Sequence, residues 1–127
     1  MGPNKSVLVI EDNSANMKLV RTLLQLGKYQ VMEAVDAETG IEVARERQPD
    51  LILMDIQLPG IDGFEATKIL KASPDTAHIA IVALTSYAMD GDRKKAKEAG
   101  CDGYIAKPID TRTFLSKIAS FLPEGDK

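Results

Sequence analysis

The chain has 127 residues, 44% of them apolar and 28% charged, which is the size and composition of one soluble globular domain. Its net charge of −3 argues against a general nucleic-acid binder, and its apolar runs are too short to cross a bilayer. Cys101 is the single cysteine, which excludes an internal disulfide or a two-cysteine metal site and suits a reducing cytoplasm.

The domain is expected to span residues 5–122. Residues 1–4 are interpreted as a leader that is disordered or left by a tag, and residues 123–127 as a frayed tail. No charged-then-apolar leader opens the sequence, so we expect the protein to stay in the cytoplasm and to have no contact with membranes.

Five short apolar runs, most of them rich in β-branched residues, predict five strands. In chain order they are residues 7–10 (VLVI), 30–34 (QVMEA), 51–54 (LILM), 79–84 (IAIVAL) and 103–106 (GYIA). Their near-continuous apolar character, in place of strict alternation, is typical of strands that are covered on both faces, as in a parallel sheet.

Apolar residues between these runs recur at helical spacing and predict helices. The residues are Leu19, Val20, Leu23 and Leu24, then Ile41 and Ala44, then Phe64 and Ile69, and finally Phe114, Ile118 and Leu122. We expect Ser14 to cap the first helix, Gly27 to end it, and Gly100 to end a fourth helix over Asp90–Ala99. This alternation of strand and helix predicts an α/β domain with a central parallel sheet and right-handed crossovers.

Polar residues follow four of the five predicted strands. They are Glu11 and Asp12, Asp55, Thr85 and Ser86, and Lys107 and Pro108. Ligand sites of open parallel sheets form at the carboxyl ends of the strands, so these groups are expected to converge. Alone, each has an ordinary explanation, since an acid after a strand is often a helix cap and a lysine is usually a solvated charge. Their joint placement indicates a site.

Three crowded carboxylates repel one another, and a hard divalent cation relieves that repulsion. Oxygen ligands without His or Cys point to Mg²⁺, with Mn²⁺ as an alternative, and Mg²⁺ often shares its ligand shell with a phosphoryl group. Lys107 and Thr85 are suited to bind the oxygens of such a group, and Asp55 is then a candidate nucleophile that forms an aspartyl phosphate.

The segments VLVIEDN, DLILMDIQLPGIDG, IVALTSYA and AGCDGYIAKPI occur in this order and with the gaps found in receiver domains of response regulators. The chain resembles this family of two-component signalling proteins across residues 5–122, and NMKL and DLILMDIQLPGIDG are most similar to its single-domain regulators of cell division. The resemblance implies a flavodoxin-like (βα)5 doubly wound sheet in strand order 2-1-3-4-5, with two helices on one face and three on the other.

The resemblance also implies roles in the metal site. Asp55 matches the phosphoacceptor and a metal ligand, and Asp12 matches the direct Mg²⁺ ligand. Glu11 matches a ligand that acts through water, and the backbone carbonyl of Gln57 matches the remaining protein ligand. Gly63, with Pro59, is expected to shape the loop that follows Asp55 and passes close to the ligand.

The same comparison assigns the signalling residues. Thr85 and Lys107 match the pair that binds the phosphoryl group, and the peptide bond before Pro108 is expected to be cis. Tyr104 matches the aromatic switch, for which a tyrosine half-packed on a strand is the alternative explanation. The switched surface is expected on the fourth helix, fifth strand and fifth helix, where Tyr87, Ile105 and Ala106 would offer apolar contacts.

A protein of this kind accepts a phosphoryl group from a phosphohistidine on a sensor histidine kinase or a histidine phosphotransfer protein. It catalyses only its own phosphorylation and dephosphorylation, so we do not expect an enzyme acting on other substrates. Its output is contact with a downstream protein target, as a monomer or as a phosphorylation-dependent dimer. Kinase recognition is expected on the loop after the fifth strand and on the first helix, around Asn16, Met17, Val20 and Arg21.

Gln57 lies two residues after Asp55, and Tyr87 lies two residues after Thr85. In the family that the chain resembles, the side chains at these two positions tune the lifetime of the phosphorylated state. The bulky Tyr87 is expected to shield the phosphoryl group from water. Tyr87→Ala should therefore accelerate dephosphorylation, measured by loss of the phosphorylated form over time, and an unchanged rate would contradict this hypothesis.

Two other enzyme and cofactor classes fit the chain less well than the receiver. A haloacid-dehalogenase-type phosphatase requires a second Asp two residues after the nucleophile, where this chain has Gln57. A flavin-binding module requires a Ser/Thr/Gly-rich phosphate loop after the first strand, where this chain has EDNSAN. A receiver excised from a hybrid kinase or a multidomain regulator remains open, and so does a pseudo-receiver that binds metal and acts only as an interaction module.

Overall fold

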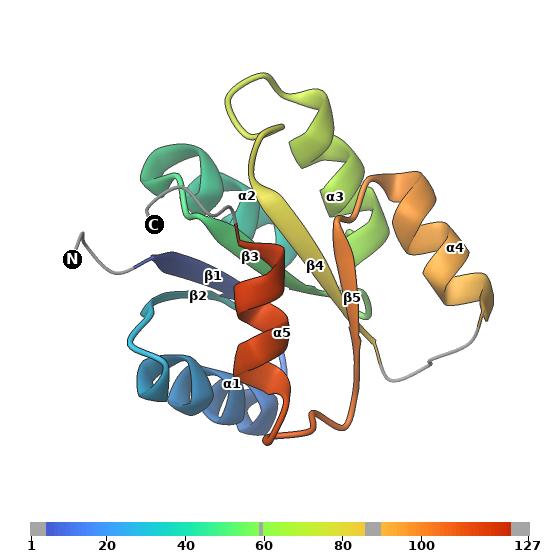
Figure 1. Cartoon of the computed structure of the whole chain (residues 1–127). Coiled ribbons are helices and arrows are strands. Elements are labelled where there is room, and N and C mark those ends of the chain that lie inside the picture. The colour runs from blue at the N-terminus through green and yellow to red at the C-terminus, as the bar shows by residue number, and fades with distance from the viewer. Residues whose placement is uncertain (1–4, 59, 86–89, 123–127) are drawn as a thin grey trace.

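Five parallel strands form one sheet in the order β2-β1-β3-β4-β5 (Figure 1). The strands are β1 Ser6–Ile10, β2 Gln30–Ala34, β3 Leu51–Asp55, β4 Ala80–Thr85 and β5 Gly103–Ala106. The computed structural model describes residues 5–58, 60–85 and 90–122, with the backbone alone for 90–93. The predicted α/β fold, its parallel sheet and its strand order are confirmed.

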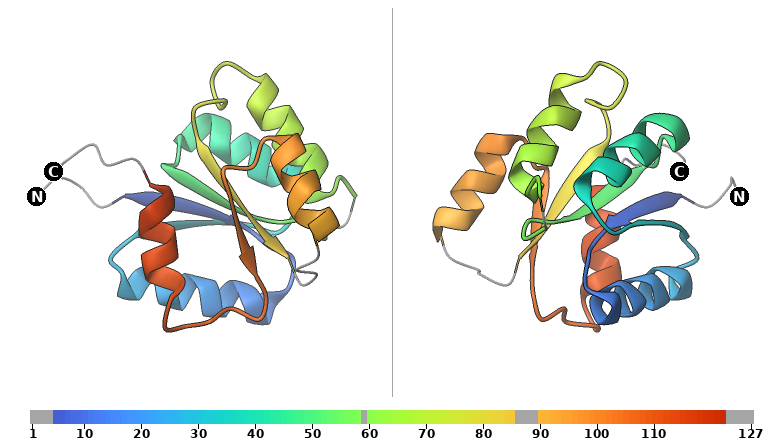
Figure 2. Two further views of the ribbon diagram at one scale, coloured as in Figure 1. Left: turned by 45° about the vertical axis from the view of Figure 1, so that its right-hand side comes forward. Right: turned by 180° about the vertical axis from the view of Figure 1, so that it is seen from behind.

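Helices cover both faces of the sheet, as the views in Figure 2 show from two sides. They are α1 Ser14–Leu26, α2 Ala37–Arg47, α3 Gly63–Ala72, α4 Asp90–Ala99 and α5 Phe114–Phe121. α1 and α5 lie on one face, and α2, α3 and α4 lie on the other. In the described part of the chain, no helix is long and apolar enough to cross a membrane.

The core consists of two main clusters, one on each side of the sheet. Strand residues alternate between them, so that Val9 and Leu53 pack toward α1 and α5 while Leu8 and Ile52 pack toward α2 and α3. The apolar runs of β1, β3 and β4 are almost entirely buried, as expected for strands covered on both faces. The edge strands β2 and β5 are more exposed.

The register of the sheet brings the strand ends to the same level. Ile10 pairs with Met54, so that Glu11 follows β1 at the level where β3 ends in Asp55. Asp55 in turn pairs with Leu84, and Thr85 pairs with Ala106. Because all five strands run in the same direction, the polar residues that follow them gather at one edge.

The start of α1 differs from the prediction. Asn13, and not Ser14, is the cap, because its Oδ1 accepts a hydrogen bond from the Asn16 backbone N–H at 2.9 Å. Leu19 is exposed at 37%, and Met17 is buried in its place, since two residues along a helix turn the side chain to nearly the opposite side. The end at Gly27 is confirmed.

Two other helix ends also bear on the predictions. Gly100 follows α4 with a φ of +108°, a conformation that favours glycine, as expected for a residue that ends a helix. Leu122 was expected to continue the last helix but lies just beyond α5, which ends at Phe121.

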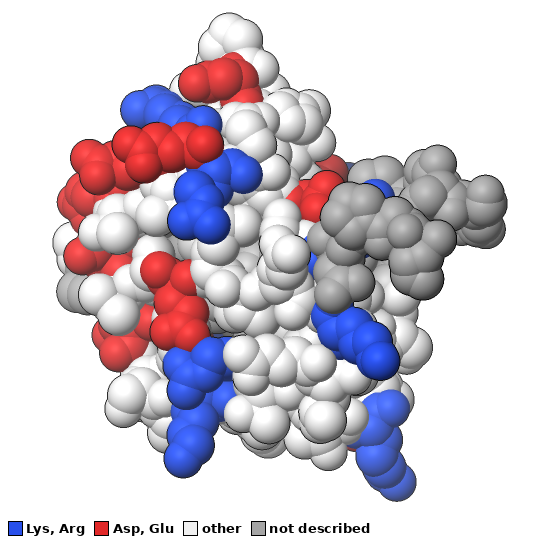
Figure 3. Space-filling model, turned by 90° about the vertical axis from the view of Figure 1, so that its left-hand side faces the viewer, with Lys and Arg blue, Asp and Glu red and all other residues white. Residues whose placement is uncertain are grey.

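Charges of both signs are mixed on the side of the molecule shown in Figure 3. A nucleic-acid footprint would require a continuous basic patch or stripe, and this face has none. One ion pair, between Arg21 on α1 and Glu33 on β2, has an N···O distance of 2.7 Å.

Candidate phosphoacceptor and metal site

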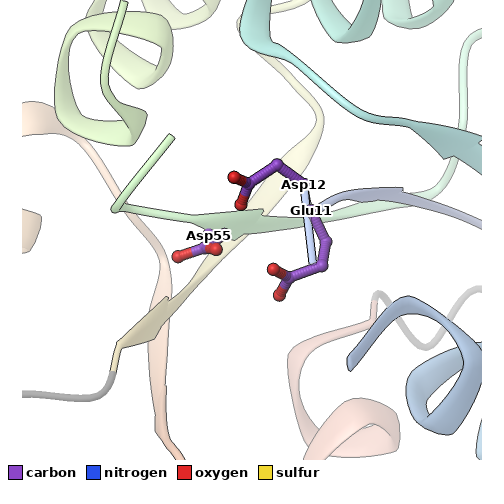
Figure 4. A group of neighbouring side chains, drawn as sticks. All are labelled: Glu11, Asp12 and Asp55. Atoms are coloured by element: carbon purple, nitrogen blue, oxygen red, sulfur yellow. The ribbon is translucent and has the colours of Figure 1, made fainter. Parts of the chain in front are cut away.

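Three carboxylates meet at the carboxyl edge of the sheet (Figure 4). Glu11 and Asp12 directly follow β1, and Asp55 is the last residue of β3. One carboxylate oxygen of each lies within 4.8 Å of those of the other two. Glu11 and Asp55 are only 1% and 3% exposed, whereas Asp12 is exposed to solvent. The cluster is therefore closed on the protein side and open on the Asp12 side.

Lys107 connects the end of β5 to this cluster. Its Nζ lies 3.0 Å from Oε1 of Glu11 and 3.3 Å from Oδ2 of Asp55, and its side chain is largely buried. Charge-assisted contacts of this length are strong when water is excluded, and removing one partner leaves an uncompensated charge. The predicted convergence of Lys107 with the acids is thus observed.

Backbone N–H groups hold the two buried carboxylates in place. The N–H of Asn13 donates to Oε2 of Glu11 at 3.1 Å, and that of Gln57 donates to Oδ1 of Asp55 at 2.9 Å. The second bond turns the chain back over Asp55 directly after the strand, which places the Gln57 backbone beside the cluster. The role of the Gln57 carbonyl as a metal ligand, which the resemblance implies, remains a prediction.

Gly63 packs against the backbone at the end of β3. A Cβ at this position would lie 2.5 Å from the carbonyl oxygen of Asp55 and 2.6 Å from Cα of Ile56, and the Gly63 N–H donates to the Ile56 carbonyl at 3.2 Å. Only glycine permits this approach. The predicted role of Gly63 in shaping the loop is consistent with these contacts, and Pro59 lies outside the described residues.

Gly63→Ala is expected to lower the free energy of unfolding by about 2 kcal/mol, because the new methyl group meets backbone that cannot move aside. Urea unfolding measures this change. Gly27→Ala is the matched control, since its methyl group would meet the outer end of the half-buried Leu115 side chain, which can shift. Equal losses in the two variants would contradict this account.

The pKa of Glu11 is raised above its usual value, first by burial and then by the carboxylate of Asp55, while Lys107 acts in the opposite direction. The folded state therefore binds a proton more tightly than the unfolded state. Without a cation, the stability contributed at this site falls as the pH rises above the ordinary glutamate range. A cation at the cluster would favour the ionised form and reverse this dependence.

Glu11→Gln is expected to raise the free energy of unfolding by about 1 kcal/mol at neutral pH without Mg²⁺, and to flatten its pH dependence. Lys107 keeps its contact with Asp55 in this variant. Affinity for Mg²⁺ should fall about ten-fold if Glu11 orients metal-bound water, as the resemblance implies. Urea unfolding between about pH 5 and 8, with and without Mg²⁺, measures both effects; a variant that is less stable at every pH would contradict the prediction.

The remaining predicted residues lie on the neighbouring strands. Thr85 ends β4 and is fully buried, and its carbonyl accepts the Lys107 N–H at 2.7 Å. The Lys107–Pro108 peptide bond is cis, as expected. Tyr104 lies half-buried on β5, packed against the small cluster of Ile56, Ala83 and Ala96.

Tyr87 and Ser86 lie outside the described residues. Apart from Pro59 and Tyr104, every other residue assigned to the site is placed at or beside the strand ends. Tyr104 lies farther back along β5, behind the edge that carries the carboxylates.

The carboxylates open into a hollow, here called the acid pocket, which is lined by Glu11, Asp12, Asn13, Asn16, Asp55, Gln57 and Lys107. Sequence reasoning did not assign Asn13 and Asn16 to this site. The signal was present in the loop EDNSAN, because the helix begins so soon after Asp12 that its first turn must stand beside the cluster.

Two parts of the predicted partner surfaces are wrong. Met17 and Val20 were expected to contact a kinase, but they are 6% and 0% exposed and belong to the core under α1. Ile105 was expected to face a partner and is buried in the same core. Both errors arise because the resemblance assigns these surfaces to whole elements, without showing which side chains of an element point away from the core.

The side chains present fit a hard divalent cation. The cluster offers carboxylate oxygens, the Gln57 backbone lies beside it, and one of the carboxylates is open to solvent, so that water can complete the ligand shell. Oxygen ligands of this kind favour Mg²⁺ or Mn²⁺ over metals that prefer nitrogen or sulfur.

Comparison with known proteins gives a consistent assignment. The family described as response regulator receiver domain matches residues 7–119. The polar-differentiation response regulator DivK of Brucella anthropi is 44% identical over 121 residues, which are 95% of this chain and 98% of that protein. DivK of Brucella ovis is also 44% identical over the same length.

Solved structures agree. The receiver domain of the sensor histidine kinase PA1611 from Pseudomonas aeruginosa PAO1 is 30% identical to this chain, with a TM-score of 0.86. The match covers 93% of this chain and 97% of that one. In the PA1611 structure, a magnesium ion is coordinated in the active site cleft. The chemotaxis response regulator CheY4 of Vibrio cholerae is 25% identical with a TM-score of 0.89, covering 94% and 99%. This chain belongs to the response regulator receiver domain family.

Proposed function

We propose that the chain is a phosphorylatable switch, in which Asp55 accepts a phosphoryl group from the phosphohistidine of a sensor histidine kinase or a histidine phosphotransfer protein. The observation that carries this proposal is the buried Asp55 carboxylate, 3.3 Å from Lys107 and clustered with two other carboxylates at an opening to solvent. A purely structural ion pair would not need two additional acids. The coordinated magnesium ion in the PA1611 receiver supports the assignment of Mg²⁺ as cofactor.

The transfer requires few chemical groups from the protein. An oxygen of Asp55 attacks the phosphorus atom, the P–N bond of the donor breaks, and the imidazole keeps the electron pair and takes up a proton. Lys107 exchanges part of its contact with Glu11 and Asp55 for a contact with a phosphoryl oxygen, and the Thr85 hydroxyl donates to another. Bound Mg²⁺ supplies positive charge that offsets the carboxylates and the incoming group.

The signal is proposed to leave through β4 and β5. Movement of Thr85 toward the phosphoryl group would make space for Tyr104, which already packs against Ala96 of α4. Within the part of α4 whose side chains are described, residues 94–99, only Ala96 and Ala99 are buried, so little apolar contact holds this helix. The surface of α4, β5 and α5 is then the site for a downstream protein, and half-buried Ala106 remains a candidate contact there.

The proposal includes no activity beyond phosphorylation and dephosphorylation of Asp55 itself. The two DivK relatives are named as polar-differentiation response regulators, which supports a role in polar differentiation. The proposed place of action is the cytoplasm, where histidine kinases present their phosphohistidine. The proposed kinase contacts lie on the exposed side of α1 and on the loop after β5.

Incubation with phosphoramidate, a donor that also carries a P–N bond, tests the proposal without a partner kinase. With Mg²⁺, the intact mass of the wild-type protein should increase by one phosphoryl group, and hydroxylamine should remove it, as expected for an acyl phosphate. EDTA should prevent the gain. No mass increase in Mg²⁺, together with intact folding, would contradict the proposed function and favour a pseudo-receiver.

A further inference from the structure

We infer that the side-chain amide of Asn16 is a phosphoryl-binding group that donates a hydrogen bond from α1 to the phosphoryl group on Asp55. The inference rests on the proposed function and adds a residue to its site. Asn16 is half-buried and lines the acid pocket together with Asp55 and Lys107. It is the one lining residue that comes from within a helix, since the others lie in loops or at a strand end.

The position of Asn16 is fixed by the same bonds that hold the acid cluster. Its backbone N–H donates to Oδ1 of Asn13 at 2.9 Å, and the backbone N–H of Asn13 donates to Oε2 of Glu11 at 3.1 Å. Any shift of α1 relative to the carboxylates would break this chain of hydrogen bonds. The backbone of Asn16 is therefore held beside the pocket before a ligand arrives, which lowers the entropy lost when its side chain binds.

The amide of Asn16 is available for a ligand. Among the described residues, the hydrogen bonds of Asn16 involve its backbone, and none engages its side-chain amide. Asn13, the neighbouring amide, already uses Oδ1 to cap α1. A half-buried asparagine that lines a pocket, and whose amide has no partner among the described residues, is well placed to bind a ligand or its water.

The charge balance of the pocket explains why a neutral donor is useful there. Three carboxylates and one lysine surround the site, and a phosphoryl group adds about 1.5 to 2 negative charges. Its three oxygens accept more hydrogen bonds than Lys107 and Thr85 can supply. An amide N–H contributes one more without adding a charge that would compete with Mg²⁺ for the carboxylates.

Beryllofluoride, which takes the place of a phosphoryl group on a carboxylate, tests this inference. Its affinity in saturating Mg²⁺ is measured by ¹⁹F NMR titration, and Mg²⁺ affinity is measured separately by calorimetry. Asn16→Ala should weaken beryllofluoride binding about ten-fold, as expected for a lost hydrogen bond to a charged group, and change Mg²⁺ affinity by less than about two-fold. Gln25→Ala removes an exposed amide from the same helix and should behave as the wild type.

Asn16→Asp distinguishes the loss of the hydrogen-bond donor from a change in side-chain shape, because aspartate has the shape of asparagine but cannot donate a hydrogen bond when ionised. It should weaken beryllofluoride binding more than Asn16→Ala while strengthening Mg²⁺ binding, since it adds a fourth carboxylate. Equal beryllofluoride affinity in Asn16→Ala and the wild type would overturn the inference. A loss of Mg²⁺ affinity in Asn16→Ala as large as its loss of beryllofluoride affinity would also overturn it, because Asn16 would then act on the metal. A wild type that binds no beryllofluoride in Mg²⁺ would instead contradict the proposed function itself.

Discussion

Replacing Asp55 with asparagine is expected to abolish phosphorylation, with no mass gain detectable in phosphoramidate and Mg²⁺. The substituted side chain would keep the shape and the contact with the Gln57 N–H, but an amide oxygen is too poor a nucleophile to replace a carboxylate. We expect no detectable phosphorylation at all, because the two other carboxylates cannot take the place of Asp55. Glu11 and Asp12 follow β1, whereas Asp55 is the last residue of β3. Intact mass after incubation measures it.

The fold of this variant should be preserved or strengthened. Asp55→Asn removes one of three repelling carboxylates, so the free energy of unfolding without Mg²⁺ should stay equal to that of the wild type or rise. Asp75→Asn, a substitution at an exposed turn, is the matched control and should phosphorylate normally. Phosphorylation of the Asp55 variant at the wild-type rate would show that another residue is the acceptor.

Lys107→Met is expected to affect both stability and phosphorylation. Without Mg²⁺, the buried carboxylates of Glu11 and Asp55 lose their cationic partner, and the free energy of unfolding should fall by about 3 kcal/mol at neutral pH. The deficit should shrink as the pH falls, because protonation of Glu11, whose pKa is already raised, removes one of the uncompensated charges. Urea unfolding at several pH values measures this.

Phosphorylation of the same variant should be slower by about a hundred-fold or more, since a group that offsets the charge developing on the transferred phosphoryl is lost. Added Mg²⁺ should restore much of the stability but little of the phosphorylation rate, which distinguishes the structural role of Lys107 from its catalytic role. Lys117→Met, on an exposed position of α5, is the control. A variant that recovers both properties in Mg²⁺ would mean that Lys107 acts only as a structural counter-ion.

Much of the fold could be predicted from the sequence because buried parallel strands and their polar ends are local signals. The apolar run of 51–54 and the acid that follows it are contiguous, so a strand that delivers Asp55 to the sheet edge needs no tertiary information. Strand order is different, because it depends on which helices cover which face. It was inferred from resemblance and not from periodicity.

Side-chain direction was the part that could not be read from the sequence. Leu19 and Met17 are both apolar and near each other, and only the packing of α1 against the sheet decides that Met17 is buried. For the same reason, the place of Asn16 in the lining of the acid pocket could not be predicted, since a polar residue in a first helical turn faces either solvent or the site. Ser14 and Asn13 are both good caps, and the outcome depends on where the loop after Asp12 turns.

The most direct test of a phosphorylatable switch is amide NMR of the wild type and the Asp55→Asn variant, each with Mg²⁺ and beryllofluoride. In the wild type, we expect shifts that extend from Asp55 through Thr85 to Tyr104 and α4, and we expect none of these shifts in the variant. Wild-type shifts confined to the acid pocket, with Tyr104 unchanged, would contradict a switch and leave the carboxylates as a metal site alone.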